Sequence, residues 1–308
     1  MRVAFLVRRY RRELAQMRHY ALFIGYPRSG HTAVAALLDA HPRMLFANGL
    51  DVASYICRGF TAAQVAGLSI WNSLRFTRRG RRSNGFDYTV PDGWHGRWEA
   101  LEVIGDKSGD LLSARLTREP GLIVDLLIEF GPQLRFIHVI RNPFDCISTI
   151  ASRGKIGLIQ ATAEFFSLCE ANRIARDVVP SQAWQDVYLE TLIEHPRPVI
   201  ARLCRFLGQT AGGPYLDACA KLVFAAPRRS RDRVTWPTDL VARITRRMHS
   251  FPWLSDYDFV ETGPVRQPSD EPVQVLVEAP ADRSEALPRH PARDAARSGR
   301  ATAGVAGA

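Results

Sequence analysis

Short apolar runs alternate along the chain with longer segments in which apolar residues recur at helical spacing. A continuous apolar run predicts a buried parallel strand, and apolar residues three and four positions apart predict an amphipathic helix. Strands are expected near residues 21, 44, 102 and 135, with a shorter fifth strand over 184–189. Helices are expected after residue 30, over 52–76, 119–130, 160–177, 197–207 and 214–222, and one more that carries Ser148 and Thr149. This alternation predicts an α/β fold in three layers, αβα, with a central parallel sheet.

A glycine-bounded loop follows the first expected strand. Gly25 and Gly30 enclose four residues, and His31 and Thr32 open the next helix pattern. Backbone N–H groups at a helix N-terminus favour a bound anion, and the helix dipole adds to this preference. The spacing is that of the phosphate-binding loop G-x-x-x-x-G-K-[ST], with His31 in place of lysine. This spacing predicts a P-loop nucleoside-triphosphate-hydrolase-like sheet and a phosphate site, although an ordinary capped βα turn is the alternative. The residues expected to bind phosphate here are Pro27, Arg28, Ser29, Gly30, His31 and Thr32.

Polar residues also follow the other expected strands. Asp51 comes after the second strand, Lys107 after the third, and Arg141 after the fourth. Ser148 and Thr149 stand seven and eight residues beyond Arg141. Ligands of open α/β sheets bind at the carboxyl ends of the strands, and an arginine with a helical hydroxyl can hold a phosphate. Two separate cationic sites therefore suit a ligand with two separated phosphate groups.

The charge of the chain favours an anionic ligand. The 308 residues carry a net charge of +10, with a pI of about 9.8. Such an excess also suits nucleic acid or an anionic membrane, but aromatic and basic residues are not interleaved as in nucleic-acid motifs, so no nucleic-acid partner is expected. The five cysteines are widely spaced without a CxxC pair, which indicates neither a zinc site nor a disulfide framework. Reduced thiols predict a cytoplasmic protein.

The chain divides into three parts by composition. Residues 1–19 are expected to form a basic arm or helix, for which a weak peripheral contact with anionic lipid is an open alternative. Residues 20–261 are expected to form the α/β domain, and 77–98 within it a long irregular insertion of the kind that forms lids or substrate loops. From 262 to 308 the chain is rich in Pro, Ala, Arg, Glu and Gly, which predicts a disordered tail.

Two of the motifs resemble those of the sulfotransferase family. The sequence YPRSGHT at 26–32 is similar to that family's 5′-phosphosulfate loop, and RNPFDCIST at 141–149 is similar to its 3′-phosphate motif. The segment SRDRVTW at 230–236 is similar to the R-x-x-V-x-W segment near the family's C-terminal end, which implies phosphate contacts from Arg231 and Arg233. The resemblance covers residues 20–260 in matching order. It implies 3′-phosphoadenosine 5′-phosphosulfate (PAPS) as the donor, no metal, and a sulfuryl group moved to an acceptor hydroxyl or amine.

The resemblance also implies roles for single residues. Arg28 would neutralise the donor's 5′-phosphate, and Lys107 matches the family lysine that follows a sheet strand. The general base is expected to be Asp51, which is equally well interpreted as a helix cap. Asp110 and His95 are the alternatives for the base.

The acceptor is expected to be a small molecule, a glycan or a glycolipid, held by variable loops at 52–98 and 150–165. Two other functions compete with this one. A nucleotide kinase or NTPase would use Gly25–Thr32 for phosphates and Asp106 for magnesium, but it lacks the loop lysine. A non-enzymatic protein that binds anions or nucleic acid is the third alternative.

Overall fold

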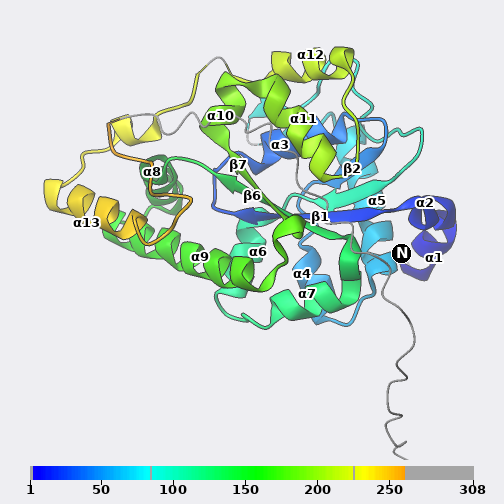
Figure 1. Ribbon diagram of the computed structural model, residues 1–308, viewed down its shortest axis with the longest axis horizontal. Coiled ribbons are helices and arrows are strands. Elements are labelled where there is room, and N and C mark those ends of the chain that lie inside the picture. The colour runs from blue at the N-terminus through cyan, green and yellow to red at the C-terminus, as the bar shows by residue number, and fades with distance from the viewer. Residues whose placement is uncertain (1–2, 84, 225, 261–308) are drawn as a thin grey trace, which may run out of the picture. The chain divides into compact units, whose positions relative to one another are not determined.

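The computed structural model describes residues 3–83, 85–224 and 226–260, all within one compact unit, Met1–Pro268. Its centre is a five-stranded parallel sheet with strand order β2-β5-β1-β6-β7 (Figure 1). The sheet and its flanking helices confirm the predicted α/β fold class. The tail expected to be disordered, 262–308, lies outside the described residues. The strands of the sheet are β1 (His19–Gly25), β2 (Met44–Ala47), β5 (Val103–Asp106), β6 (Leu134–Ile140) and β7 (Trp184–Tyr188).

The apolar run of β1 packs on both faces of the sheet. Tyr20, Leu22 and Ile24 join one buried cluster, and Ala21 and Phe23 join another. Successive side chains of a strand point to opposite faces, so a continuous apolar run is needed wherever helices cover both faces. This is why the strands read as apolar runs in the sequence.

Helices cover both faces of the sheet. Figure 1 shows α4, α6, α7 and α9 on one side and α3, α10, α11 and α12 on the other. The first layer consists of α1 (Val3–Arg9), α2 (Arg11–Gln16), α4 (Val52–Cys57), α5 (Ala62–Arg78), α6 (Gly109–Leu116), α7 (Leu122–Phe130) and α9 (Leu158–Val178). The second layer consists of α3 (His31–Asp39), α10 (Leu189–Glu194), α11 (Pro196–Phe206) and α12 (Gly213–Leu222). A third apolar cluster joins α8 (Pro143–Gly154) and α13 (Thr238–Met248) to α9.

Some elements differ from the expected ones. The helix expected over 52–76 is two helices, because the chain turns at Arg58, Gly59 and Phe60 before Thr61 caps α5 with both halves of a capping box. The helix α6 was not predicted, since its sequence follows the expected third strand directly. Short 3-10 turns also occur at Gly131–Gln133, Ser181–Ala183 and Ser230–Arg233. Among the described helices, none is long and apolar enough to span a membrane.

The three central strands bring their carboxyl ends together. In the register of the sheet, Leu22 of β1 lies opposite Asp106 of β5, and Gly25 of β1 lies opposite Val139 of β6. The segments that follow β5, β1 and β6 therefore leave the same edge of the sheet side by side. They begin with Lys107, the glycine-bounded loop and Arg141.

The insertion at 77–98 is held by a buried ion pair. It contains a short hairpin in which two strands of two residues each pair, β3 (Arg82–Ser83) with β4 (Phe86–Asp87). On one side of the hairpin, the Arg81 guanidinium lies 2.7 Å from the Asp39 carboxylate at the end of α3, and both side chains are at most 6% exposed. On the other side, Nδ1 of His95 lies 3.3 Å from the same carboxylate. Both flanks of the hairpin are thus tied to the helix that follows the loop.

Replacing Arg81 with alanine is expected to destabilise the protein by about 3–5 kcal/mol, because it leaves the Asp39 carboxylate buried without its arginine. Urea unfolding followed by circular dichroism would measure this loss. The matched control is Arg197→Ala, which breaks an ion pair with Asp217 whose side chains are 49% and 57% exposed. That change is expected to cost about 0–1 kcal/mol. Equal losses in the two variants would contradict the anchoring role of Arg81.

Candidate functional site

The loop between β1 and α3 is a tight, partly strained turn. Ser29 is buried, and both its backbone N–H (3.2 Å) and its hydroxyl (3.0 Å) donate to the carbonyl of Tyr26. Arg28 has a φ of 69° and Gly30 a φ of 106°, so two of the loop residues are in the left-handed region. Left-handed backbone in a residue other than glycine costs energy and is concentrated at functional sites. No side chain caps the start of α3, which leaves its first N–H groups available for an anion. Pro27, Arg28 and Gly30 are half-buried around this opening.

His31 does not take the place of a loop lysine. Its ring is buried, with Nε2 3.1 Å from the hydroxyl of Ser29, and packs edge-on against Phe23. A Cβ added at Gly109 would lie 2.7 Å from this ring, so the space for the ring exists because residue 109 is glycine. Burial lowers the pKa of His31 to about 4, which keeps the imidazole neutral at pH 7. His31 therefore supports the loop from beneath and contributes no charge to it.

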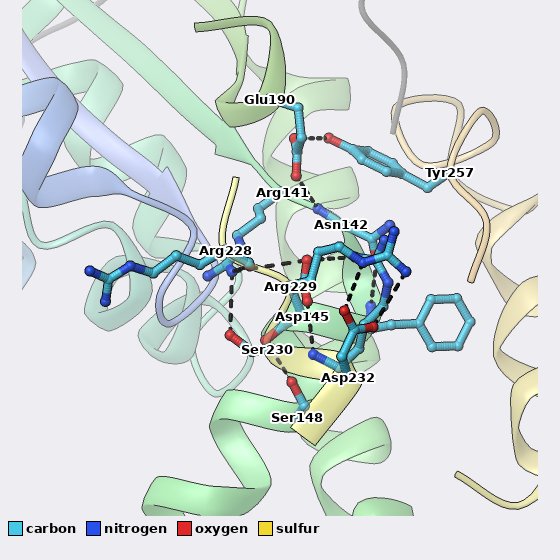
Figure 2. A network of polar contacts seen from close by, with 12 residues as sticks. Arg141, Asn142, Asp145, Ser148, Glu190, Arg228, Arg229, Ser230, Asp232 and Tyr257 are labelled. Atoms are coloured by element: carbon cyan, nitrogen blue, oxygen red, sulfur yellow. Dashed lines mark hydrogen bonds and ion pairs between the residues drawn. The ribbon is translucent and has the colours of Figure 1, made fainter. Parts of the chain in front are cut away.

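Arg141 is hydrogen-bonded to the loop, and Figure 2 shows its side chain next to Arg228 and Ser230. Its Nη1 donates to the carbonyl of Arg28 at 3.0 Å, and its Nη2 donates to the carbonyl of Arg228. Nη2 also lies 3.4 Å from the hydroxyl of Ser230 and 3.9 Å from the Asp145 carboxylate. One guanidinium thus joins the end of β6, the loop after β1 and the segment before the last 3-10 turn. Its two closest partners are uncharged carbonyls, and the Asp145 carboxylate is closer to Arg231, at 2.7 Å, than to Arg141.

The two candidate hydroxyls of α8 both bond to one carbonyl. Ser148 donates to the carbonyl of Asp145 at 3.1 Å, and Thr149 donates to the same oxygen at 2.8 Å. Ser148 is buried and Thr149 half-buried, so Thr149 is the more accessible of the pair. Either hydroxyl must rotate away from this carbonyl before it can donate to a phosphate.

The carboxylate of Asp145 holds Arg231 in the interior. Arg231 is 1% exposed, its Nη1 lies 2.7 Å from Asp145 Oδ2, and its backbone N–H donates to Oδ1 at 2.9 Å. Its Nε donates to the carbonyl of Phe259 at 2.9 Å. Arg231 therefore fixes the C-terminal segment to α8 in this structure, while Arg233, at the end of the same 3-10 turn, is exposed. Their phosphate contacts stay predictions.

Lys107 follows β5 on the other side of the loop. Its side chain is half-buried, and burial lowers the pKa of its ammonium group, against the opposing charges of Asp106 and Asp110. Asp106 itself is buried and accepts the backbone N–H of Leu50 at 2.8 Å. Burial raises the pKa of the Asp106 carboxyl group. Lys107 thus lies at the candidate site, whereas the carboxylate of Asp106 is held inside the fold.

Asp51 is paired with an arginine. Its carboxylate accepts two hydrogen bonds from Arg115 of α6, at 3.0 Å to Oδ1 and 2.6 Å to Oδ2. Asp51 occupies the position before α4, but its side chain makes no capping hydrogen bond, so the interpretation as a side-chain cap is wrong. Its backbone N–H donates to the hydroxyl of Ser108 at 3.2 Å. The role of Asp51 as a general base stays a prediction, and it requires an oxygen that is released from Arg115.

The alternative bases have different surroundings. The Nε2 of His95 accepts the backbone N–H of Val90 at 2.8 Å, and its Nδ1 faces the buried Asp39. Both ring nitrogens of His95 are thus engaged inside the insertion. Asp110, in the first turn of α6, is half-buried, and its charge partly opposes the burial that lowers the pKa values of His31 and Lys107. Of the two alternative bases, Asp110 is therefore the one whose charge acts on His31 and Lys107 at the site.

Two further arginines lie near the loop, and no motif in the sequence indicated them as a pair. Burial and then the charge of Arg153 lower the pKa of Arg28. Burial raises the pKa of Tyr88, and the charges of Arg28, Arg153 and Arg228 oppose this rise. We refer to Arg28, Arg141, Arg153 and Arg228 as the arginine cluster. Within the described ranges, Arg28, Arg153 and Arg228 form no ion pair with a carboxylate, so like charges gather here without neutralisation.

The side chain of Arg228 links this cluster to the insertion. Its guanidinium lies 4.9 Å from the ring centre of Phe86 in β4 and 5.0 Å from that of Phe224. These cation–π contacts hold the hairpin against the segment whose carbonyl binds Arg141. The basic composition of 226–236 was the only feature of the sequence that indicated a role for Arg228.

A narrow crevice opens beside the loop. Its polar lining comes from the start of α3, the ends of β2 and β5 and the insertion, and its apolar lining from α3, β2 and α5. The lining residues are Thr32, Asn48, Lys107, Tyr88, Asp39 and Arg81, with Ala35, Ala36, Phe46, Ala47 and Phe76. The crevice therefore joins two predicted site residues, Thr32 and Lys107, to the insertion expected to contact substrate. In the part of the chain that the structure describes, no group of three His, Cys, Asp or Glu side chains could hold a metal ion.

Residues 117–211 match the protein family described as "Sulfotransferase family". The matched segment contains β6, Arg141 and α8 with Ser148 and Thr149. The similarity to the sulfotransferase family thus covers the segment that carries the second cationic site. No curated protein matches the sequence significantly.

Several solved structures have a similar arrangement. One is the sulfotransferase domain from the olefin synthase of Synechococcus PCC 7002, at 16% identity over 73% of this chain and 83% of that one, with a TM-score of 0.45. The sulfotransferase domain from the curacin biosynthetic pathway is 12% identical over 77% and 99% of the two chains, with a TM-score of 0.49. Sulfotransferase STF9 from Mycobacterium avium is 13% identical over 85% and 83%, with a TM-score of 0.47.

Replacing Gly109 with alanine is expected to destabilise the protein by about 1–3 kcal/mol, although alanine is the better helix former, because the new methyl group meets the His31 ring. Urea unfolding would measure the change. The control is Gly121→Ala, where an added Cβ meets nothing within 4 Å and stability is expected to stay the same or rise. A Gly109→Ala protein as stable as the wild type would show that His31 is not confined as described.

Proposed function

We propose that the protein is a PAPS-dependent sulfotransferase, which moves a sulfuryl group from PAPS to a hydroxyl or amine of an acceptor. In this reaction the acceptor atom forms a bond to sulfur while the bond from sulfur to the 5′-phosphate oxygen breaks. Adenosine 3′,5′-bisphosphate leaves, and the acceptor proton passes to a base. Donor and acceptor must be aligned, and negative charge on the leaving phosphate must be stabilised.

One observation carries this proposal. Three adjacent strands, β5, β1 and β6, end at the same edge of the sheet with Lys107, the loop with Arg28, and Arg141. A donor with phosphates at both its 3′ and 5′ positions needs two separated cationic sites and a third cation at the leaving oxygen. The Arg141–Arg28 hydrogen bond of 3.0 Å fixes two of these sites relative to each other.

Each residue would have a separate role. Loop N–H groups and Arg28 would hold the 5′-phosphate, and Arg28 would act only as an electrostatic clamp because an arginine does not give up its proton. Arg141, with Thr149 or Ser148, would hold the 3′-phosphate, and Lys107 would stabilise the leaving oxygen. Asp51 would accept the acceptor's proton. The neutral His31 beneath the loop weighs against a kinase, because it supplies no cation for a γ-phosphate.

The acceptor would approach through the crevice beside the loop. Thr32 and Lys107 line the crevice together with Tyr88 of the insertion, so an acceptor there would lie next to the donor's sulfur. A small molecule, a glycan and a glycolipid remain the candidate acceptors. A panel of a phenol, an aliphatic alcohol and an amino sugar, assayed with radiolabelled donor, would distinguish their classes.

The protein is expected to bind adenosine 3′,5′-bisphosphate much more tightly than AMP, since only the bisphosphate engages Arg141. Arg141→Ala is expected to reduce this preference about tenfold or more, because a hydrogen bond to a charged group contributes about 1.5–3 kcal/mol. Isothermal calorimetry with both nucleotides would measure the ratio of affinities.

The control for this measurement is Arg135→Ala, at the opposite end of the strand that Arg141 follows. Arg135 donates to the carbonyls of Pro132 and Leu134, so its loss is expected to leave both affinities unchanged. Equal affinity of the wild type for AMP and the bisphosphate would refute the two-site arrangement. Tight, magnesium-dependent binding of ATP instead would favour a kinase.

Asp51→Asn is expected to slow transfer by about 10²–10⁴-fold with donor affinity intact, as the loss of a general base does. Lys107→Ala is expected to slow transfer and also to weaken donor binding, since it removes a charge from the leaving oxygen. Turnover of an acceptor from the panel and calorimetry with the bisphosphate would separate the two roles.

The matched control is Asp217→Asn, which removes a carboxylate paired with an arginine at an exposed position. It is expected to change neither quantity. If Asp51→Asn keeps normal turnover while Lys107→Ala is inactive, Asp51 only pairs with Arg115. Asp110 or the acceptor itself would then supply the base, and the donor site would be unaffected.

A further inference from the structure

A row of hydrogen-bonded polar side chains, buried at Tyr26 and His138 and half-buried at Asp186, lies beneath the loop and has no part in the transfer chemistry proposed above. It runs from Tyr26, the first residue after β1, through His138 of β6 to Asp186 of β7. Tyr26 and His138 are both 0% exposed. Trp253, from the segment after α13, contacts Tyr26 as well. Buried polar groups are costly unless each is paired, so such a row calls for a specific role.

Chemistry sets the direction of the hydrogen bonds at the two ends of the row, and the protonation state of His138 sets the direction of the middle one. An indole N–H can only donate, so the hydroxyl oxygen of Tyr26 accepts from Trp253 Nε1 at 2.7 Å. A carboxylate can only accept, so Nδ1 of His138 carries the proton that is donated to Asp186 Oδ1 at 3.1 Å. Burial lowers the pKa of His138, so the ring is neutral at pH 7 and its Nε2 is an acceptor. The Tyr26 hydroxyl donates to this Nε2 at 3.3 Å.

The far end of the row is anchored by an ion pair. Asp186 Oδ2 accepts from Nη1 of Arg176 at 2.8 Å, and Oδ1 accepts from Trp184 Nε1 at 2.8 Å. Burial alone would raise the pKa of Asp186, but the contacts with His138 and the charge of Arg176 lower it overall. Asp186 therefore stays ionised and fixes the tautomer of His138.

The near end of the row is the first residue of the loop, Tyr26. Its carbonyl accepts hydrogen bonds from the backbone N–H and the hydroxyl of Ser29, and this turn contains Arg28 in its left-handed conformation. A strained residue keeps its conformation only when its surroundings impose it. His138 lies three residues before Arg141 on β6, so the same row contacts the strand that ends in the second cationic site.

We propose that Tyr26 and His138 are positioning residues, which hold the loop at a fixed place relative to Arg141 before any ligand binds. The hydrogen bond between the Tyr26 hydroxyl and His138 Nε2 transmits the rigidity of β6 to the loop. The consequence for donor affinity rests on the proposed function, whereas the ordering of the loop does not.

Two substitutions of His138 separate this role from simple packing. Glutamine places an amide oxygen near the position of Nε2, so it can still accept from Tyr26 but cannot donate to Asp186. Asparagine places its amide N–H near the position of Nδ1, so it keeps the bond to Asp186 and loses the acceptor for Tyr26. A positioning role through Tyr26 predicts that His138→Gln is the milder change at the loop.

The experiment measures two quantities in the full chain. Deuterium exchange of backbone amides over 26–32, without ligand, reports the ordering of the loop, and calorimetry with adenosine 3′,5′-bisphosphate reports its function. Tyr26→Phe and His138→Asn are expected to speed loop exchange about tenfold and to weaken binding about tenfold, the effect of losing one buried hydrogen bond. When Tyr26→Phe and His138→Asn are combined, the loss of binding affinity is expected to be no larger than in either single variant, because both remove the same hydrogen bond.

The matched control is Tyr20→Phe, on the same strand. Tyr20 is also fully buried and makes one hydroxyl contact, 2.6 Å to Ser69, but it lies far from the loop along β1. It is expected to leave exchange over 26–32 unchanged. Any general loss of stability appears in exchange throughout the sheet and is thereby separated from a local effect.

Two results would overturn the proposal. One is loop exchange at the wild-type rate in Tyr26→Phe, and the other is an equal effect of His138→Gln and His138→Asn. If the wild type does not bind the bisphosphate while the exchange rates follow the expected order, the positioning role is supported and the proposed function fails.

Discussion

The hydrogen bonds from the Arg141 guanidinium to two backbone carbonyls hold the candidate site together. They join the loop after β1 to the segment before the last 3-10 turn, and they fix Arg141 without neutralising it. A carboxylate in the same place would bind the guanidinium more strongly but would also cancel its attraction for an anion. The arginine cluster thus has a defined geometry and keeps its attraction for an anion. Repulsion between its like charges lowers the stability of the fold.

Buried aspartates contribute the complementary part of this design. Asp39 and Asp145 are buried and pair with arginines from distant parts of the chain, and the half-buried Asp186 pairs with Arg176, ten residues before it. These pairs attach the insertion to α3, the C-terminal segment to α8, and α9 to β7, respectively. A buried ion pair adds little net stability compared with an apolar contact, but it is costly to break and so specifies which segments meet. The arginines closest to these aspartates are Arg81, Arg231 and Arg176, and of the arginine cluster Arg141 also lies 3.9 Å from Asp145.

The sequence predicted the sheet well because its strands are apolar on both faces, and it predicted the loop because its glycines have a characteristic spacing. It did not predict which charged groups pair. Arg231 lies in a motif that suggested a phosphate contact, yet its guanidinium is buried against Asp145, 86 residues away along the chain. Asp51 was interpreted as a base or a cap, and its partner Arg115 is 64 residues away. Such pairs depend on how distant segments pack, and no local pattern encodes them. The place of His31 likewise depends on the missing side chain at Gly109, which only the packed structure shows.

The way in which the insertion is attached has a consequence for how this protein can change. Its two anchors, Arg81 and His95, meet at one buried carboxylate, whereas the hairpin between them has exposed positions at Arg82, Gly85 and Asp87. Substitutions at the tip alter the surface next to the crevice without touching the ion pair or the sheet. Mutational drift can therefore sample new surfaces at this edge while the residues proposed to bind anions at the strand ends stay the same. Under the proposed function, selectivity for the acceptor and binding of the donor would therefore depend on different parts of the chain.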